Sequence, residues 1–219
     1  MENLTRLQSK FLQAFFQTYL KKDFFLSGGT ALSAFYLQHR VSDDIDLFTV
    51  SQSVEMNAVT AEVLKIIHRL EGKINNQVST VTYIQFIFIC AGEKLKVDVI
   101  KGTPVHFGKT QEVNNITVDS LENIAVGKLL ALYGRAEAKD FVDLYFLLKV
   151  DKKIAFDKLF KLAKQKDSGL HEFYLAEMMT KIDDLTLFPK MLKPIDRKDL
   201  ISYFLDLSNT LYKKIKPKK

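Results

Sequence analysis

The chain has 219 residues, of which 47% are hydrophobic and 26% are charged, and its formal net charge is +6. These values are ordinary for a soluble globular protein and allow one large domain, or a larger domain followed by a small helical one. A single cysteine, Cys90, excludes an intramolecular disulfide, and the scattered histidines exclude a Cys/His zinc site of ordinary spacing. The N-terminus lacks a signal-peptide pattern and no apolar run approaches the roughly 18 residues that span a bilayer, so a cytoplasmic location without membrane contact is expected.

The first half of the chain is predicted to contain both helices and strands. Apolar residues near helical spacing predict an amphipathic helix over residues 4–21, and a short apolar segment then leads into Gly28 and Gly29. The elements expected after the glycines are a helix over 30–38, a strand over 45–50, a helix over 54–71, and two antiparallel strands over 81–90 and 94–100 that join near Gly92.

The second half is predicted to be helical. Asp119 is expected to cap a long helix over residues 121–150, with Glu122 as its capping-box partner and a break near Gly134. Further helices follow, with loops near residues 168–169 and 188–194. Because the strands are confined to the first half, the pattern predicts an α+β fold, with a boundary near residue 115 between the mixed part and the helical part.

Gly28 and Gly29 stand directly before a predicted helix. Adjacent glycines let a ligand approach the backbone closely, and the N–H groups at a helix N-terminus attract phosphate. Thr30 would add a hydroxyl group to such a site. The alternative is a plain tight turn, which a lone pair of glycines would favour.

Two carboxylates in the next predicted strand favour a ligand site over a plain turn. Residues two apart in a strand point to the same face, so Asp44 and Asp46 project together while Ile45 and Leu47 face the core. Side-by-side carboxylates repel each other, and a divalent cation such as Mg²⁺ or Mn²⁺ removes the conflict. A solvated acidic turn is the alternative, but it does not account for the alternation with apolar residues.

A third carboxylate is predicted on the strand over 94–100. Leu95 and Val97 share one face of that strand, and Asp98 lies on the other face with Lys96. If this strand pairs beside residues 45–50, Asp98 comes near Asp44 and Asp46. Three carboxylates could hold two metal ions, or one metal ion together with a general base for an acceptor hydroxyl.

Cations on the helix over 121–150 form a second candidate cluster. Lys128, Arg135 and Lys139 are seven and four residues apart, which predicts nearly one helix face, suited to neutralising a triphosphate. The alternative is a solvated face with pairs such as Lys139–Asp143. Lys128 differs from the others because it interrupts an apolar run, where it either binds a ligand or is a core-edge lysine that extends to solvent.

The basic charge is concentrated at the C-terminus. Residues 213–219 hold five lysines, against a net charge of +6 for the whole chain, so the rest of the chain is close to neutral. This tail is either a solvated end or an electrostatic arm for nucleic acid.

Three stretches together resemble the nucleotidyltransferase AbiEii/AbiGii-type toxin family, within the polymerase-beta-like nucleotidyltransferase superfamily. They are SGGTAL (27–32), HRVSDDIDLF (39–48) and KDFVDLY (139–145), with Lys128 and Arg135 at the right distance before the last. The resemblance covers roughly residues 20–150. It implies a nucleotidyltransferase core, a twisted mixed sheet with flanking helices, over residues 1–115, and a helical domain over 116–219.

The resemblance also implies a function and a set of site residues. It implies transfer of NMP from an NTP to an acceptor, with Mg²⁺ or Mn²⁺ bound by Asp44 and Asp46, and with Asp98 as the third carboxylate. It implies that Asp140, like these three carboxylates and Lys128, is a catalytic residue. The implied nucleotide-binding residues are Gly28, Gly29, Thr30, Arg40, Ser42, Lys128 and Arg135.

Members of the family are often toxins, so the resemblance implies a possible cognate antitoxin and an acceptor that is RNA, including transfer RNA, or protein. Two other interpretations are open from the sequence. One is a non-catalytic NTP-binding module on the same fold, and the other is a nucleic-acid-binding protein that uses the basic tail. All three candidate carboxylates are present, which favours the enzyme.

Overall fold

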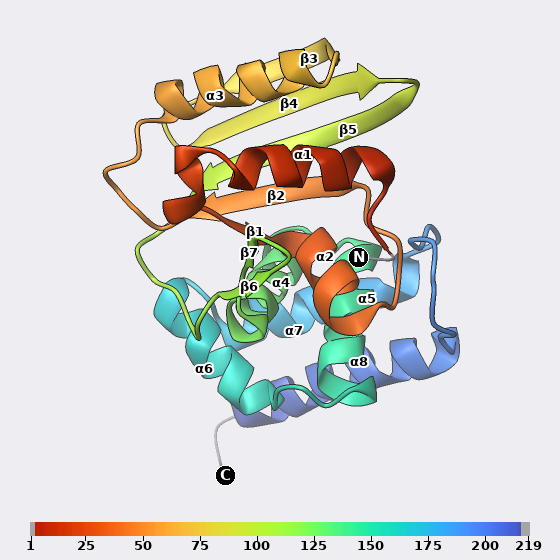
Figure 1. The fold of residues 1–219 in the computed structure, drawn as a ribbon. Coiled ribbons are helices and arrows are strands. Elements are labelled where there is room, and N and C mark those ends of the chain that lie inside the picture. The colour runs from red at the N-terminus through yellow and green to blue at the C-terminus, as the bar shows by residue number, and fades with distance from the viewer. Residues whose placement is uncertain (1–2, 216–219) are drawn as a thin grey trace. The chain divides into compact units, whose positions relative to one another are not determined.

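The computed structural model describes residues 3–215. The chain divides into two compact units, Met1–Leu121 and Glu122–Lys219. The first holds all the strands that the structure describes, and the second holds only helices and their connections (Figure 1). The predicted α+β class, with strands confined to the first half, is therefore confirmed. Within the described residues, no helix is both long enough and apolar enough to cross a membrane.

A seven-stranded mixed sheet forms the first unit, in the order β3-β4-β5-β2-β1-β7-β6. The pairs β2–β5 and β1–β7 are parallel, and the other neighbours are antiparallel. The strands are β1 (Phe25–Ser27), β2 (Asp44–Thr49), β3 (Lys73–Ser79), β4 (Tyr83–Cys90), β5 (Glu93–Lys101), β6 (Gln111–Val113) and β7 (Ile116–Val118).

The predicted antiparallel strands near Gly92 are confirmed as the β4–β5 hairpin. Ala91 and Gly92 form its turn, with φ of 48° and 83°. Two central residues with positive φ give the turn a twist that matches the twist of the flanking strands. The short apolar segment before Gly28 is β1, and the strand predicted over 45–50 is β2, which begins one residue earlier, at Asp44.

Three strands, β3, β6 and β7, were not predicted from the sequence. All seven residues of β3 are exposed, so this edge strand lacks the alternation of apolar and polar residues that marks a half-buried strand. Strands β6 and β7 have three residues each, too few for a period to be recognised.

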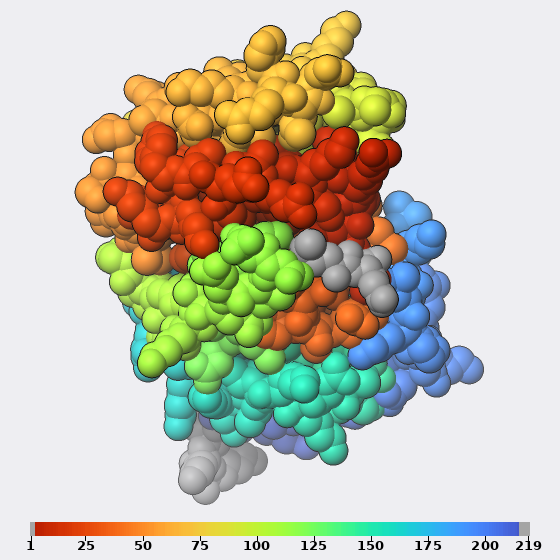
Figure 2. All heavy atoms as spheres, in the orientation of Figure 1, coloured from red at the N-terminus to blue at the C-terminus, as the bar shows by residue number. Residues whose placement is uncertain are grey.

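One face of the sheet is covered by α1 (Arg6–Phe16) and α3 (Met56–Arg69). In Figure 2 the red atoms that include α1 lie next to the orange-yellow atoms around α3 on the face shown. Beneath them lie fully buried side chains of β4 and β5, among them Phe86, Phe88 and Val97, and the ring of Phe88 lies 6.0 Å from that of Phe11. The polar residues of β2 and β5 therefore project from the opposite face.

Helix α1 is shorter than predicted. Thr5 and Gln8 form a capping box at its start, and it ends at Phe16 rather than continuing to residue 21. Thr18 then caps a separate 3₁₀ helix, η1 (Tyr19–Lys22). The threonine hydroxyl competes for backbone groups and so favours a new start over continuation of the helix.

The helix after the glycines also differs from its prediction. It begins at Gly28 instead of residue 30 and runs as α2 (Gly28–Ala31) into the π-helical η2 (Leu32–Leu37), with Gln38 as its C-cap at a φ of 50°. Both glycines thus belong to the first turn of the helix. The helix predicted over 54–71 is α3.

Helices of the second unit pack around a core that includes Phe141 and Phe204, whose rings meet edge to face at 4.9 Å. The elements are α4 (Leu121–Gly134), α5 (Ala138–Tyr145), η3 (Phe146–Val150), α6 (Phe156–Lys166), α7 (Glu172–Thr180), η4 (Lys181–Asp184) and α8 (Arg197–Ile215). Lys213 and Lys214 belong to α8, and Lys216, Lys218 and Lys219 of the basic tail lie outside the described residues.

The predicted break near Gly134 is confirmed, since α4 ends there and Ala136 has a φ of 51°. The prediction that Lys128, Arg135 and Lys139 share one face of one helix is therefore wrong. Arg135 lies in the connection, and Lys139 lies on a separate helix, α5.

Candidate active site

The candidate carboxylates lie on two adjacent parallel strands of the first unit. In the β2–β5 ladder, Asp46 stands opposite Asp98 and Asp44 stands opposite Lys96. The predicted pairing of these two segments is confirmed. All four side chains belong to the face that α1 and α3 leave uncovered, because they alternate with the buried Ile45, Leu47, Val97 and Val99.

The glycine turn lies directly beside this ladder. Ser27, which precedes Gly28, stands opposite Asp46 in the β1–β2 pair. Gly28 has a φ of +67°, and a Cβ atom built on it would lie 1.9 Å from Oδ2 of Asp46. Glycine is required here both by the backbone conformation and by the close approach of the carboxylate.

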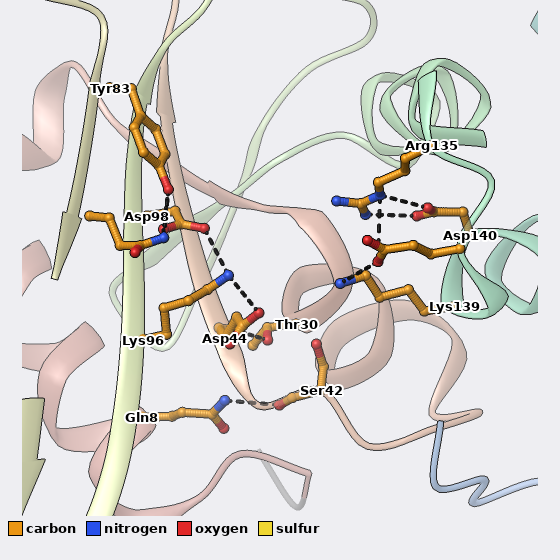
Figure 3. A network of polar contacts seen from close by, with 12 residues as sticks. Gln8, Thr30, Ser42, Asp44, Tyr83, Lys96, Asp98, Arg135, Lys139 and Asp140 are labelled. Atoms are coloured by element: carbon orange, nitrogen blue, oxygen red, sulfur yellow. Dashed lines mark hydrogen bonds and ion pairs between the residues drawn. The ribbon is translucent and has the colours of Figure 1, made fainter. Parts of the chain in front are cut away.

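Gly29 is also closely packed. A Cβ atom on it would lie 2.6 Å from Nη2 of Arg40 and 2.9 Å from Oγ of Ser42. Arg40 is only 3% exposed, and its Nη1 donates to the carbonyl of Val41 at 2.9 Å. Gln8 of α1 fixes the same loop by donating to the carbonyl of Ser42 at 2.9 Å (Figure 3).

Thr30 is held to the strand rather than directed outward. It is 1% exposed, and its hydroxyl donates to the main-chain carbonyl of Asp44. The structure therefore gathers Gly28, Gly29, Thr30, Arg40 and Ser42 around one turn beside the carboxylates. A direct contact of any of them with phosphate stays a prediction.

Lys96 is the central cation of this cluster, and sequence analysis gave it no role. Its Nζ lies 3.0 Å from Oδ2 of Asp44 and 3.1 Å from Oδ2 of Asp98 (Figure 3). Partial burial lowers the pKa of Lys96, but hydrogen bonds to the two carboxylates and their negative charges outweigh it and raise the pKa above its ordinary value. The ammonium is thus held in its charged form.

Asp98 is oriented from β4 by Tyr83 and Gln85, two further residues without a predicted role. The Tyr83 hydroxyl and the Gln85 amide donate to Oδ1 of Asp98 at 2.9 and 3.0 Å. Burial, followed by the hydrogen bond to Asp98, raises the pKa of Tyr83 to about 12. The only sequence signal for both residues is their alternation with Ile84 and Phe86, which places them on the carboxylate face.

Oxygen donors on one face are the ligand type that Mg²⁺ and Mn²⁺ prefer. Within residues 3–215, however, no three His, Cys, Asp or Glu side chains are gathered closely enough to hold a metal ion. The Lys96 ammonium lies between Asp44 and Asp98. By donor type these carboxylates fit a divalent cation, and the two that share the Lys96 ammonium, Asp44 and Asp98, would be enough for Mg²⁺, which commonly takes one or two carboxylates together with substrate phosphates.

Another buried carboxylate supports the start of the glycine turn. Asp119 is fully buried, and its Oδ2 accepts a hydrogen bond from the Ser27 hydroxyl at 2.6 Å. Its Oδ1 lies 2.8 Å from Nε2 of His106. Sequence analysis assigned Asp119 only to helix capping, because its partners are distant in the sequence.

The candidate residues of the second unit form an ion-pair cluster of their own. Lys128 is buried, with its Nζ 2.7 Å from Asp143 and 3.7 Å from Asp140. Arg135 donates to both oxygens of Asp140, at 2.9 and 3.0 Å (Figure 3). Lys128 is consequently not a lysine that extends from the core edge to solvent, because its ammonium is buried between two carboxylates.

Lys139 pairs with Glu137 at 3.0 Å, and not with Asp143 as the alternative of a solvated helix face predicted. Burial disfavours ionisation of Glu137, but Lys139 and Arg135 outweigh it and lower the pKa of Glu137 below its ordinary value.

Comparison with solved structures identifies the fold. A putative nucleotidyltransferase from H. pylori is 17% identical, with a TM-score of 0.61 over 96% of this chain and 93% of that one. MenT4, the nucleotidyltransferase toxin Rv2826c from Mycobacterium tuberculosis H37Rv, is 12% identical, with a TM-score of 0.57 over 96% of this chain and 83% of that one. At these identities the likeness shows the fold, which is that of nucleotidyltransferases.

The family follows from the sequence itself. The model of the nucleotidyl transferase AbiEii toxin family, described as a type IV toxin–antitoxin system, matches residues 10–208. The chain belongs to this family and is a nucleotidyltransferase. It is also similar to an uncharacterized protein of Aquifex aeolicus (strain VF5), 25% identical over 186 residues that cover 84% of this chain and 85% of that protein.

Proposed function

We propose that the protein joins the α-phosphate of an NTP to an acceptor hydroxyl and releases pyrophosphate, with the help of Mg²⁺ or Mn²⁺ held by Asp44, Asp46 and Asp98. The observation that carries this proposal is the register of the first unit. Asp46 stands opposite Asp98 on one side and opposite Ser27, the residue before the glycine turn, on the other. Strand β2 thus has the second carboxylate-bearing strand, β5, on one side and the turn suited to phosphate, at the end of β1, on the other.

In this proposal the metal ion, when bound, neutralises negative charge that develops on the phosphates. The N–H groups of the first helical turn, which starts at Gly28, bind phosphate oxygens. Arg40 and Ser42 hold the shape of that turn by packing on Gly29, and Thr30 ties it to the strand of Asp44. Asp98 either binds metal or accepts the proton of the acceptor hydroxyl.

Lys128 and Arg135 are the proposed nucleotide-binding cations of the second unit, with Asp140 as the acidic residue that positions them. The support is that Asp140 is fully buried and accepts two hydrogen bonds from Arg135, with Lys128 at 3.7 Å. Any contact between Lys128 and a triphosphate must compete with its existing pairs to Asp143 and Asp140.

The partners are proposed from the family. Its description as a toxin of a type IV system supports an NTP substrate and a cognate antitoxin. The acceptor is proposed to be RNA, including transfer RNA, or protein, since either offers a hydroxyl group for nucleotide transfer.

The test is transfer of label from each of the four α-³²P-labelled NTPs to total RNA or to lysate protein, with Mg²⁺, Mn²⁺ or EDTA. We expect label in one acceptor class, with one NTP preferred, only when metal is present. Asp46→Asn is the control, because it keeps the size of the side chain and removes its charge. Equal labelling in EDTA, or by the Asp46→Asn protein, would contradict the proposed metal site.

A further inference from the structure

The Lys96 ammonium takes up the position expected of a cation in the carboxylate cluster. It lies 3.0 Å from one oxygen of Asp44 and 3.1 Å from one oxygen of Asp98, so it bridges the two strands that carry the candidate metal ligands. Its side chain is 30% exposed, which leaves it room to move away from the pair. Figure 3 shows the ammonium between the two carboxylates.

This arrangement is held in place from a third strand. Tyr83 and Gln85 both donate to Oδ1 of Asp98, and the Gln85 amide also donates to the Tyr83 hydroxyl at 2.7 Å. With Oδ1 occupied in this way, Asp98 turns Oδ2 toward Lys96. Two hydrogen bonds from β4 thus orient the Asp98 carboxylate in addition to its ion pair with Lys96.

We propose that Lys96 is the resident cation of the active site, which balances Asp44 and Asp98 in the metal-free protein and is displaced from them when a divalent cation binds. This inference rests on the proposed function, because it takes these carboxylates as metal ligands. An ammonium and a divalent cation bound to the same oxygen atoms repel each other strongly at such distances. One of them must leave.

The displacement couples metal binding to nucleotide binding. A bare divalent cation must displace the ammonium without offering it a new partner, so Lys96 weakens the affinity for metal alone. A metal ion that arrives with a triphosphate brings negative charge, to which the released ammonium can turn. Lys96 thereby favours the loading of metal together with nucleotide over the loading of metal alone.

The experiment measures Mn²⁺ affinity of the full chain by electron paramagnetic resonance of free Mn²⁺, with and without a non-hydrolysable NTP analogue. We expect Lys96→Met to bind Mn²⁺ about tenfold more tightly than the parent protein without nucleotide, because it removes a positive charge beside the ligands. With the analogue present, this gain should shrink or disappear. Lys96→Arg, which keeps the charge, should remain close to the parent.

Lys94→Met is the matched control. Lys94 lies two residues earlier on β5, on the same face as Lys96, and is exposed. Its loss removes the same charge from the same strand at a greater distance from Asp98, so Mn²⁺ affinity should change less than about twofold, since surface charges are screened. Thermal unfolding in EDTA shows whether each variant is folded.

Two results would overturn the inference, and they are distinguishable. If Lys96→Met binds Mn²⁺ no more tightly than the parent while Asp46→Asn loses binding, the metal site stands and the role of Lys96 is wrong. If Asp46→Asn binds Mn²⁺ as well as the parent, the metal site itself is wrong and the role of Lys96 falls with it.

Discussion

The two units each contain a lysine between two aspartates, in very different surroundings. In the first unit the side chains of Lys96, Asp44 and Asp98 are 30%, 38% and 12% exposed. In the second, Lys128 is 8% exposed and both of its carboxylate partners are fully buried. The cost of separating an ammonium from a carboxylate rises steeply as water is excluded. Lys96 can therefore leave its two carboxylates at a small cost in free energy, whereas Lys128 can leave its partners only at a large one.

Because of this contrast, the two clusters have to be tested by different measurements. Changes in the partly exposed cluster of the first unit should alter metal binding and catalysis while leaving the fold stable. Changes in the buried cluster should reduce stability first, and any effect on nucleotide binding has to be measured under conditions in which the variant is folded.

The largest expected effect is on catalysis, from Asp46→Asn. Nucleotide transfer should fall by about a thousandfold, since a bound metal ion contributes several kcal/mol to stabilising the transition state. The free energy of unfolding should change by less than about 1 kcal/mol, because the carboxylate face is partly exposed. Transfer rates and urea unfolding of the same preparation measure both. Activity within a few-fold of the parent would remove Asp46 from the metal site.

Lys128→Met should show the opposite pattern. It leaves buried carboxylates without their ammonium, which typically costs about 3–5 kcal/mol of stability. Asp140 keeps its two hydrogen bonds from Arg135, so we expect the lower part of that range. Urea unfolding measures the loss. A loss below about 1 kcal/mol would mean that the second cluster is as exchangeable as the first.

Binding of an NTP analogue by the folded fraction of Lys128→Met then separates a structural role from a nucleotide-binding role. A binding constant equal to that of the parent protein would leave Lys128 a structural residue.

Two glycines, one in each unit, extend the comparison to the backbone. Gly28→Ala should destabilise by at least about 1 kcal/mol and reduce transfer, because its φ is +67° and the new methyl group would collide with Asp46. Gly127→Ala, one residue before Lys128, meets nothing within 4 Å inside α4 and should stabilise by about 0.5–1 kcal/mol. Thermal unfolding of both variants tests the pair. Destabilisation by Gly127→Ala would show that the helix surface there is not free.

The smallest expected effect is that of Lys96→Met on stability without metal. A partly exposed ion pair contributes about 0–1 kcal/mol, so the loss in EDTA should stay within that range. Added Mn²⁺ should raise the melting temperature of Lys96→Met more than that of the parent, since binding to the folded state stabilises it in proportion to affinity. A loss near that of Lys128→Met would show that the first cluster is also a structural one.

The sequence by itself determined the features that depend on neighbours along the chain. Alternation with Ile45 and Leu47 placed Asp44 and Asp46 on one face, and the glycines before a helical segment marked the turn. These stretches also carried the family resemblance. Local spacing is sufficient for such features because strand and helix periods fix the direction of each side chain.

Only the tertiary structure decided which side chains meet across strands and across helix breaks. The register of β2 against β5 brought Lys96 between Asp44 and Asp98, and β4 brought Tyr83 and Gln85 onto Asp98. The break after Gly134 moved Lys139 onto another helix. A one-residue change of register reverses every face of a strand, and ion pairs form only where burial and distance allow. Neither quantity is encoded in the spacing of residues along the chain.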